Sequence, residues 1–305
     1  MGKEIKKSIS LVLSSGGARG VAHIGVIEEL EKQGYEIKSV AGTSMGALIG
    51  GIYASGKLEE YKDWICSLDK LDVFKLIDFT FSANGLVKGD RVFKEMHKFI
   101  PDVNIEDLQI PFAAVATDIV NEKEIVFTKG SLFDAVRASI AIPTIFTPKH
   151  KDGLQLVDGG ILNPIPVNRV KRYENDILVV VNVNARIPYK KSVIPKEKGK
   201  LNKLLYNKRI KSFEKRLSEI IPKHKRDKLG YFKLLSATTN LMLYQISMMS
   251  LEQYSPDMLI NISRKSFGTY DFYKAKEMIE TGKTAARLSI KEFKMLNNKK
   301  IKSSS

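Results

Sequence analysis

Hydrophobic and polar positions follow one another along the chain in the order expected of strands joined by helices. Short apolar runs at Ser8–Ser14 and Ile37–Ala41 predict two strands. Between them, apolar residues recur at helical spacing over Val21–Gln33, and this predicted helix ends at Gly34. The small apolar residues of Ala47–Ala54 predict a second, buried helix. Strand–helix–strand–helix is the order of a parallel sheet covered by helices.

The rest of the chain continues this pattern. Further strands are predicted at Phe112–Thr117, Glu124–Thr128, Leu154–Val157, Ile177–Val183 and Met258–Ile262. Further helices are predicted at Leu58–Phe81, Asp90–Phe99, Leu132–Ser139, Leu204–Ile221, Phe232–Leu251 and Lys274–Leu296. The run Ile177–Val183 is the most apolar, which predicts a place at the centre of the sheet. The expected fold class is α/β, a central and mostly parallel sheet with helices on both faces in three layers.

Length and composition bound the number of domains. The chain has 305 residues, of which 43% are hydrophobic and 28% charged, and this suits a soluble globular protein. We expect a single domain over residues 1–305, with a compact core at 8–185 and a basic insertion at 186–230. Residues 231–296 would complete the fold with helices and a last strand, and residues 297–305 would form a disordered tail.

Positive charge is concentrated in one segment. The net charge is +16, and between Arg186 and Lys228 sixteen Lys and Arg stand against four Asp and Glu. An anionic membrane attracts each such side chain by about 1 kcal/mol, and Phe213 and Leu217 would give the helix predicted there an apolar face. Peripheral contact of 186–230 with an anionic membrane therefore stays open beside a merely solvated insertion. Nucleic acid is the weakest partner, because no recognised binding motif accompanies the charge.

Cellular location can be addressed from apolar runs and cysteine usage. No apolar run is long enough to cross a bilayer, and Ile9–Leu13 is too short for the core of a signal peptide. The single cysteine, Cys66, cannot form an internal disulfide, which fits a reducing compartment. We expect a cytoplasmic protein, and peripheral contact with the inner membrane surface stays open.

The turn Gly42-Thr43-Ser44-Met45-Gly46 lies between a predicted strand and a predicted helix. This is the context in which G-x-S-x-G forms a nucleophile elbow, with the serine hydroxyl exposed above the sheet. Gly42 and Gly46 support the turn, because a Cβ at either position would clash with the crossing strand and helix. By chance alone the motif occurs in about one chain of this length in ten, so other residues must decide.

A glycine-rich turn follows the first predicted strand. Gly16, Gly17 and Ala18 can direct backbone N–H groups at one point, which is the requirement of an oxyanion hole. Arg19 and Gly20 complete the turn. A nucleotide-binding loop fits poorly, because neither G-x-x-x-x-G-K-[ST] nor the spacing G-x-G-x-x-G is present.

Acyl transfer also needs a base, and the histidines do not supply one. His23, His97, His150 and His224 are the only four, and none follows a late strand as a Ser–His–Asp enzyme requires. Asp158 instead follows Leu154–Val157 and precedes Gly159 and Gly160, so its carboxylate could reach a serine hydroxyl. Asp has a pKa of about 3.9 in water, and desolvation would make it a serviceable base. A turn-initiating Asp is the alternative.

Taken together, these residues resemble the patatin-like phospholipase family. The resemblance rests on GGARGVAHIGVIEEL, GTSMGALIGG, ASIAIPTIFTP at 138–148 and DGGILNPIPV at 158–167, in that order. It covers the core at 8–185, fades through the basic insertion, and implies a three-layer fold related to the α/β-hydrolases. Four motifs in family order make a chance likeness improbable.

The resemblance implies a Ser–Asp dyad in which Ser44 is acylated and Asp158 acts as general base and then acid. The amides of Gly17 and Ala18, within the turn 16–20, would form the oxyanion hole. Arg19 matches a basic position of the family, where it would stabilise the loop or attract an acidic head group. Residues 138–143 and 163–164 match stretches that support the site, and no metal or cofactor is implied.

The reaction implied is hydrolysis of a fatty acyl ester on a phospholipid, lysophospholipid or related lipid. Two alternatives stay open. An acyltransferase would use the same acyl-enzyme with an alcohol in place of water, and a regulatory or scaffold protein would keep the fold with little turnover. The intact set of Ser44, Asp158, Gly16 and Gly17 favours an enzyme, because a scaffold does not need it.

Overall fold

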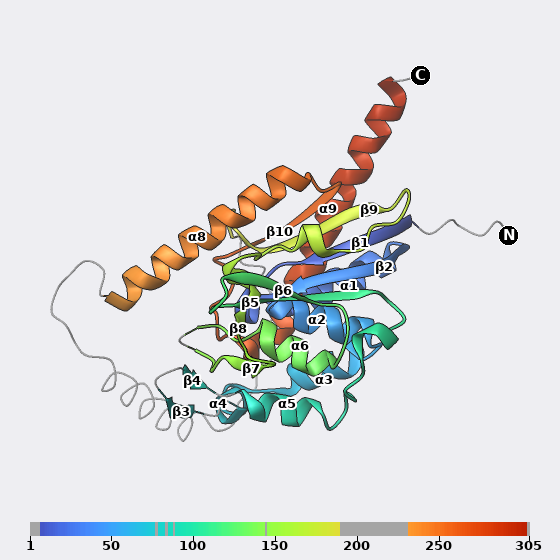
Figure 1. Ribbon diagram of the computed structural model, residues 1–305. Coiled ribbons are helices and arrows are strands. Elements are labelled where there is room, and N and C mark those ends of the chain that lie inside the picture. The colour runs from blue at the N-terminus through green and yellow to red at the C-terminus, as the bar shows by residue number, and fades with distance from the viewer. Residues whose placement is uncertain are drawn as a thin grey trace, which may run out of the picture. The chain divides into compact units, whose positions relative to one another are not determined.

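A computed structural model describes residues 7–76, 79–82, 85–87, 89–143, 145–189 and 231–303 (Figure 1). The described residues up to 189 and from 243 onward belong to one compact unit, and residues 231–242 belong to a second. The predicted helix Leu204–Ile221 and most of the predicted basic insertion lie outside the described residues.

The strands are β1 (Lys7–Leu13), β2 (Tyr35–Thr43), β3 (Phe79–Ser82), β4 (Gly85–Val87), β5 (Phe112–Asp118), β6 (Lys123–Phe127), β7 (Lys149–Lys151), β8 (Leu154–Asp158), β9 (Ile177–Ala185) and β10 (Met258–Ser263). The α-helices are α1 (Ala22–Lys32), α2 (Met45–Ala54), α3 (Leu58–Ser67), α4 (Lys70–Leu76), α5 (Asp90–Met96), α6 (Leu132–Ser139), α8 (Tyr231–Tyr254) and α9 (Ala275–Ser303). Short 3₁₀ turns include η1 (Gly17–Val21), η3 (Gly159–Ile161) and η4 (Val167–Arg169).

The main sheet has the strand order β10-β9-β1-β2-β5-β8-β7, and β6 also pairs with β5. Strands β10, β9, β1, β2 and β5 run parallel, whereas β6, β7 and β8 are antiparallel to their neighbours. The predicted mostly parallel α/β sheet is therefore confirmed. Strand β9 was expected at its centre but lies next to the edge strand β10. Its apolar run is explained by burial on both faces.

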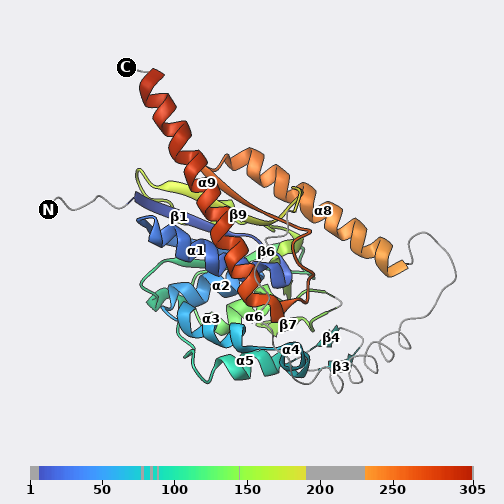
Figure 2. The same cartoon turned by 180° about the vertical axis from the view of Figure 1, so that it is seen from behind.

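Alternate residues of the strands face two different layers. On β1, Ile9, Leu11 and Leu13 pack with residues of α1, α2 and α9, which lie together on one face of the sheet (Figure 2). Val12 of the same strand packs with residues 165–170 and with Leu251 of α8 on the other face. Period-two alternation thus builds a core on each side of the sheet, as a three-layer arrangement requires.

Helices α1 and α9 approach unusually closely, and two glycines permit it. A Cβ on Gly25 would lie 1.9 Å from the carbonyl oxygen of Ile279, and one on Gly282 would lie 2.0 Å from that of Ala22. No side chain can relieve such a clash, because the obstructing atoms belong to the backbone. This contact fixes the C-terminal helix on the first helix of the chain.

Two predicted elements differ from the structure. The helix expected over Leu58–Phe81 is divided into α3 and α4, because Asp69 Oδ1 accepts the N–H groups of Leu71 and Asp72 at 2.7 and 2.8 Å and starts a new helix. The last residues of this prediction were also wrong, because Phe79–Phe81 belong to strand β3, which pairs with β4. The tail expected to be disordered from residue 297 instead continues α9 to Ser303. Adding a turn to an existing helix costs far less than starting one.

Replacing Gly25 by Ala tests the α1–α9 contact. We expect Gly25→Ala to lower the free energy of unfolding by about 2 kcal/mol or more, because backbone must move to admit the methyl group. Urea unfolding followed by circular dichroism measures it. Gly268→Ala is the control, since its Cβ would meet only the Asp271 carboxyl group at 3.5 Å. Equal stability of the two variants would contradict this account of the packing.

Candidate active site

Ser44 lies in a strained turn between β2 and α2. Its backbone has φ 57° and ψ −124°, a conformation that costs a non-glycine residue about 1–3 kcal/mol. The flanking glycines are required by contact: a Cβ on Gly42 would lie 2.3 Å from the backbone of Gly46, and one on Gly46 would lie 2.1 Å from the Leu13 oxygen. The G-x-S-x-G sequence therefore forms a sharp strand-to-helix turn with its serine at the apex.

Two polar contacts hold this turn in place. The Ser44 N–H donates to Ser139 Oγ at 2.8 Å, and the Ser139 hydroxyl donates to the Val115 carbonyl at 2.6 Å. The Thr43 hydroxyl donates to the carbonyl of Asn163 at 2.8 Å. Ser139 and Asn163 fall in the two stretches expected to support the site. The role of Ser139 was not predicted, although it is the one polar residue in the apolar run of residues 138–143.

Strand pairing brings Asp158 to Ser44. One edge of β5 pairs with β6 along residues 114–118, so the other edge is left to β2 and β8. On that edge, Thr43 of β2 pairs with Val115, and Asp158 of β8 pairs with the next residue, Ala116. The last residue of β2 and the last residue of β8 therefore meet end to end, and Ser44 follows directly.

Ser44 and Asp158 form a hydrogen-bonded pair. The Ser44 hydroxyl donates to Asp158 Oδ2 at 2.5 Å, and the Gly160 N–H donates to Asp158 Oδ1 at 2.7 Å. Ser44 is 2% exposed and Asp158 is 6% exposed. Burial raises the pKa of Asp158 to about 6, against the opposing effect of its two hydrogen bonds. Gly159 lets the chain pass this point, because its Cβ would lie 2.2 Å from the Val115 oxygen.

The glycine-rich turn after β1 lies against the start of α2. A Cβ on Gly20 would be 2.4 Å from Met45 Cβ, and Gly17 has φ +56°, which favours glycine. The Ala18 N–H donates to the carbonyl of Thr269 at 3.0 Å. This amide would become available to an oxyanion only after the Thr269 carbonyl moved away. The contact between Ala18 and Thr269 was not predicted, because the two residues lie far apart in the sequence.

Arg19 is held by the protein. Its guanidinium donates to the Phe267 carbonyl at 3.2 Å and to Asn184 Oδ1 at 2.8 Å, and the Asn184 amide donates to the Ser15 carbonyl at 2.6 Å. Burial, and then the neighbouring Arg264, lower the pKa of Arg19. Of the two expected roles, these contacts favour stabilisation of the loop over attraction of a head group.

Comparison with known proteins identifies the family of this chain. The family model of the patatin-like phospholipases matches residues 11–170, more than half of the chain. The chain belongs to the patatin-like phospholipase family. The match includes the glycine-rich turn, the elbow and the Asp158-Gly159-Gly160 sequence. The family named from the sequence motifs is therefore confirmed.

Relatives and a solved structure were also found. An uncharacterized NTE family protein of Mycobacterium tuberculosis is 43% identical over 176 residues, which are 58% of this chain and 49% of that protein. Neuropathy target esterase sws of Drosophila persimilis is 37% identical over 166 residues, 52% of this chain and 12% of that protein. The chain thus spans about half the length of the mycobacterial relative. The crystal structure of VipD from Legionella pneumophila aligns with 94% of this chain and 67% of that one, with a TM-score of 0.44 and 14% identity.

The histidines of this patatin-like phospholipase have other contacts where the structure describes them. His23 is fully buried, its Nε2 lies 3.0 Å from the Ser14 carbonyl, and burial lowers its pKa to about 4. The ring of His97 lies against Phe133, and His150 is exposed on β7. None of these three hydrogen-bonds to the dyad. Within the described ranges, no group of three His, Cys, Asp or Glu side chains could hold a metal ion.

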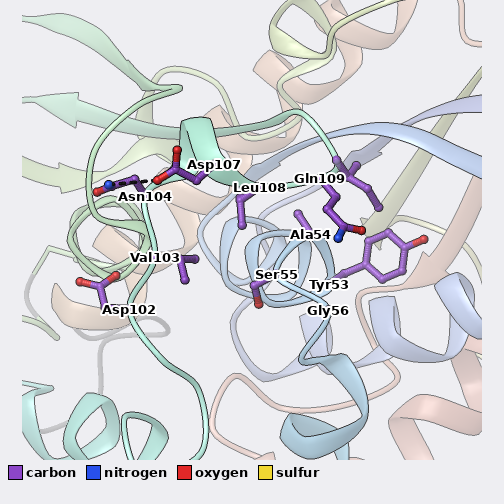
Figure 3. A pocket seen from close by; sticks show the side chains of 11 residues that line it. Tyr53, Ala54, Ser55, Gly56, Asp102, Val103, Asn104, Asp107, Leu108 and Gln109 are labelled. Carbon is purple, nitrogen blue, oxygen red and sulfur yellow. Dashed lines mark hydrogen bonds between the residues drawn. The ribbon is translucent and has the colours of Figure 1, made fainter.

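Two pockets lie away from the dyad. One, of about 590 Å³, is lined by Tyr53–Gly56 at the end of α2 and by residues from 102–110 (Figure 3). The first residue of its α2 wall, Tyr53, lies nine positions after Ser44, a rise of about 14 Å along the helix. The other, of about 370 Å³, is lined by residues that include Phe93, His97 and Arg137. Neither is lined by Ser44 or Asp158.

The buried carboxylate predicts a stability effect that depends on pH. The pKa of Asp158 is about 6 in the folded protein and 3.8 ordinarily, so the folded state binds the proton more tightly. Stability is therefore lost as the pH rises from about 4 to about 6. We expect Asp158→Asn to raise the free energy of unfolding by about 2 kcal/mol at neutral pH and by little near pH 4. Urea unfolding at both pH values measures the difference.

Asp118 provides the control for this measurement. It is also buried, but hydrogen bonds, first from the Asn121 side chain, hold its pKa below the usual range. Asp118→Asn should therefore destabilise the protein at neutral pH. If Asp158→Asn behaved in the same way, ionised Asp158 would be a stabilising group and our view of the site would be wrong.

Proposed function

We propose that this protein is a serine lipid acyl hydrolase that cleaves fatty acyl esters through an acyl-enzyme on Ser44. The observation that carries the proposal is the 2.5 Å hydrogen bond from the Ser44 hydroxyl to Asp158, at the apex of a strained elbow. A serine in this position has a base within reach and a helix N-terminus behind it. Membership of the patatin-like phospholipases supports a lipid ester as substrate.

The reaction follows from these two groups. Ser44 Oγ attacks the ester carbonyl carbon while its proton passes to ionised Asp158, giving a tetrahedral oxyanion. Collapse breaks the bond to the alcohol, which leaves with the proton from Asp158. Water then attacks the carbonyl carbon of the acyl-enzyme while Asp158 takes a proton from the water. The bond to Ser44 Oγ breaks, Asp158 returns the proton to Ser44 Oγ, and the fatty acid leaves. One carboxylate serves as base and then acid in each half of the reaction.

The oxyanion is proposed to bind the amides of the turn Gly16–Gly20, chiefly those of Gly17 and Ala18. An amide aimed at the developing charge contributes about 3 kcal/mol to the lowering of the barrier. The bond from Ala18 to the Thr269 carbonyl must break for this purpose, and Ser44 must be uncovered. The described conformation therefore corresponds to a closed enzyme, and opening precedes catalysis.

Exposed apolar side chains on the segments that follow β5 and Asp158 support a lipid substrate. Ile119 and Val120 follow β5 directly, at the end of the strand that carries the Asp158 pairing. Leu162, also exposed, lies four residues after Asp158. A fatty acyl chain would cover these side chains, whereas a polar ester would leave them in water. We also propose contact of the basic segment 186–230 with anionic lipid, since its charge favours such a surface.

Loss of either dyad residue is expected to abolish turnover. Ser44→Ala and Asp158→Asn should each lower kcat for a short-chain p-nitrophenyl ester by about a thousandfold or more, while the circular dichroism spectrum is retained. The assay is run with and without anionic micelles, so that a closed site can open. Thr284→Ala, an exposed substitution on α9, is the control. A parent protein inert in both conditions, or a fully active Ser44→Ala, would contradict the hydrolase.

The pKa of Asp158 sets the acid limb of the reaction. Since the base must be ionised and its pKa is about 6, kcat/KM should fall below that pH by about tenfold per unit. The buried neutral His23 does not contribute to this limb. Initial rates across the acid range measure it, and a His23→Gln variant should keep the same midpoint. A midpoint that shifted in the His23→Gln variant would show that our assignment of Asp158 as the base is wrong.

A further inference from the structure

Helix α8 carries few charges for a helix of its length. Of its 24 residues only Lys233 and Glu252 are charged, so that eighteen consecutive positions, Leu234 to Leu251, have no charge. Five of its leucine and methionine side chains are exposed. They are Leu234, Leu235, Leu241, Met242 and Met249, and we call them the α8 stripe. Exposed apolar surface of this extent marks an interaction site.

The second half of α8 is fixed to the core by its opposite side. The Arg186 guanidinium lies 3.8 Å from the ring centre of Tyr244, and Leu251 is buried in the core cluster. The Ser250 hydroxyl donates to the Ile165 carbonyl at 3.1 Å. Residues seven apart share one side of a helix, so Leu235, Met242 and Met249 form a line and Leu234 and Leu241 lie beside it.

The sequence before α8 indicates what covers the stripe. Lys223, Lys225, Arg226 and Lys228 precede the helix, and Tyr231 and Phe232 begin it. Basic, then aromatic, then apolar residues are the order of segments that lie in the interface of an anionic membrane. Pairing with a second α8 is less favoured, because no charged residue between Leu234 and Leu251 would set the register of two helices.

We propose that the α8 stripe docks the protein on a membrane that contains anionic lipids. The apolar side chains enter the boundary between head groups and acyl chains, and the preceding basic residues lie over the anionic head groups. In the described part of the chain no helix is long and apolar enough to cross a membrane, so α8 lies in the plane of the surface. This docking goes beyond the proposed chemistry and does not require Ser44.

Vesicle co-sedimentation tests the docking. The full-length protein is mixed with vesicles of phosphatidylcholine alone or with phosphatidylserine added. We expect binding to the mixed vesicles that weakens in high salt, and little binding to phosphatidylcholine alone. The combined variant Leu241→Gln, Met242→Gln and Met249→Gln should lower the partition coefficient by about tenfold or more, because glutamine keeps the helix but not the apolar surface.

The chain offers a closely matched control on α9. Leu288, Met295 and Leu296 are 63%, 51% and 54% exposed, against 55%, 60% and 60% for Leu241, Met242 and Met249. Their combined replacement by Gln should leave vesicle binding unchanged. Equal losses in both variants, no loss in the α8 variant, or equal binding to neutral vesicles would each overturn the proposal. Ser44→Ala protein should bind like the parent, so a failed hydrolase would not be mistaken for failed docking.

A fluorescent label separates insertion from other causes of binding. With Cys66→Ser as background, Met242→Cys and Met295→Cys each provide one cysteine for an environment-sensitive dye. Vesicles should shift the emission of a dye attached at position 242 to the blue, and they should not shift the emission of a dye at position 295. No shift at 242, or an emission already blue before vesicles are added, would show that another part of this chain or a second copy covers the stripe. Either result would overturn the proposal.

Discussion

The candidate site depends on one edge of β5, along which β2 and β8 lie end to end. Val115 is the residue at their junction. It pairs with Thr43, its carbonyl accepts the hydroxyl of Ser139, and Gly159 passes so close to the same carbonyl that a Cβ would not fit. The nucleophile and the carboxylate come from distant parts of the sequence, yet their separation is set by two consecutive backbone positions. Strand pairing is rigid, so the dyad does not rely on loops for its geometry.

This arrangement places two unfavourable features together. Ser44 is held at positive φ, and Asp158 is buried with only two hydrogen-bond donors to its carboxyl group. Both features are costly, by a few kcal/mol in total. The surrounding sheet can hold them because five parallel strands are buried on both faces and α1, α2 and α9 close one side. In the proposed mechanism, the raised pKa of the Asp158 carboxyl group is the physical property that lets one Asp act as base near neutrality without a histidine.

How much could be predicted from the sequence depended on the range of each interaction. The elbow, the glycine-rich turn and Asp158 were accessible because each is defined by neighbours along the chain. The break between α3 and α4 at Leu68–Asp69 was missed, because apolar residues continue at helical spacing past this point. The Asp69 side chain nevertheless caps a new helix there. Ser139 and Thr269 act on residues far away in the sequence, and no local pattern reports such contacts. The family resemblance supplied the dyad, since Asp158 taken alone was better explained as the first residue of a turn.

The segment Asn163-Pro164-Ile165 connects three parts of the molecule through consecutive carbonyls. That of Asn163 accepts the Thr43 hydroxyl at the elbow, and that of Pro164 accepts the Ser15 N–H at 2.9 Å beside the glycine-rich turn. The carbonyl of Ile165 accepts the Ser250 hydroxyl of α8. The elbow, the glycine-rich turn and α8 are therefore all hydrogen-bonded to one segment only three residues long. Since Ser44 is covered and the Ala18 amide is occupied, the elbow and the glycine-rich turn are the two turns that must change in the proposed reaction.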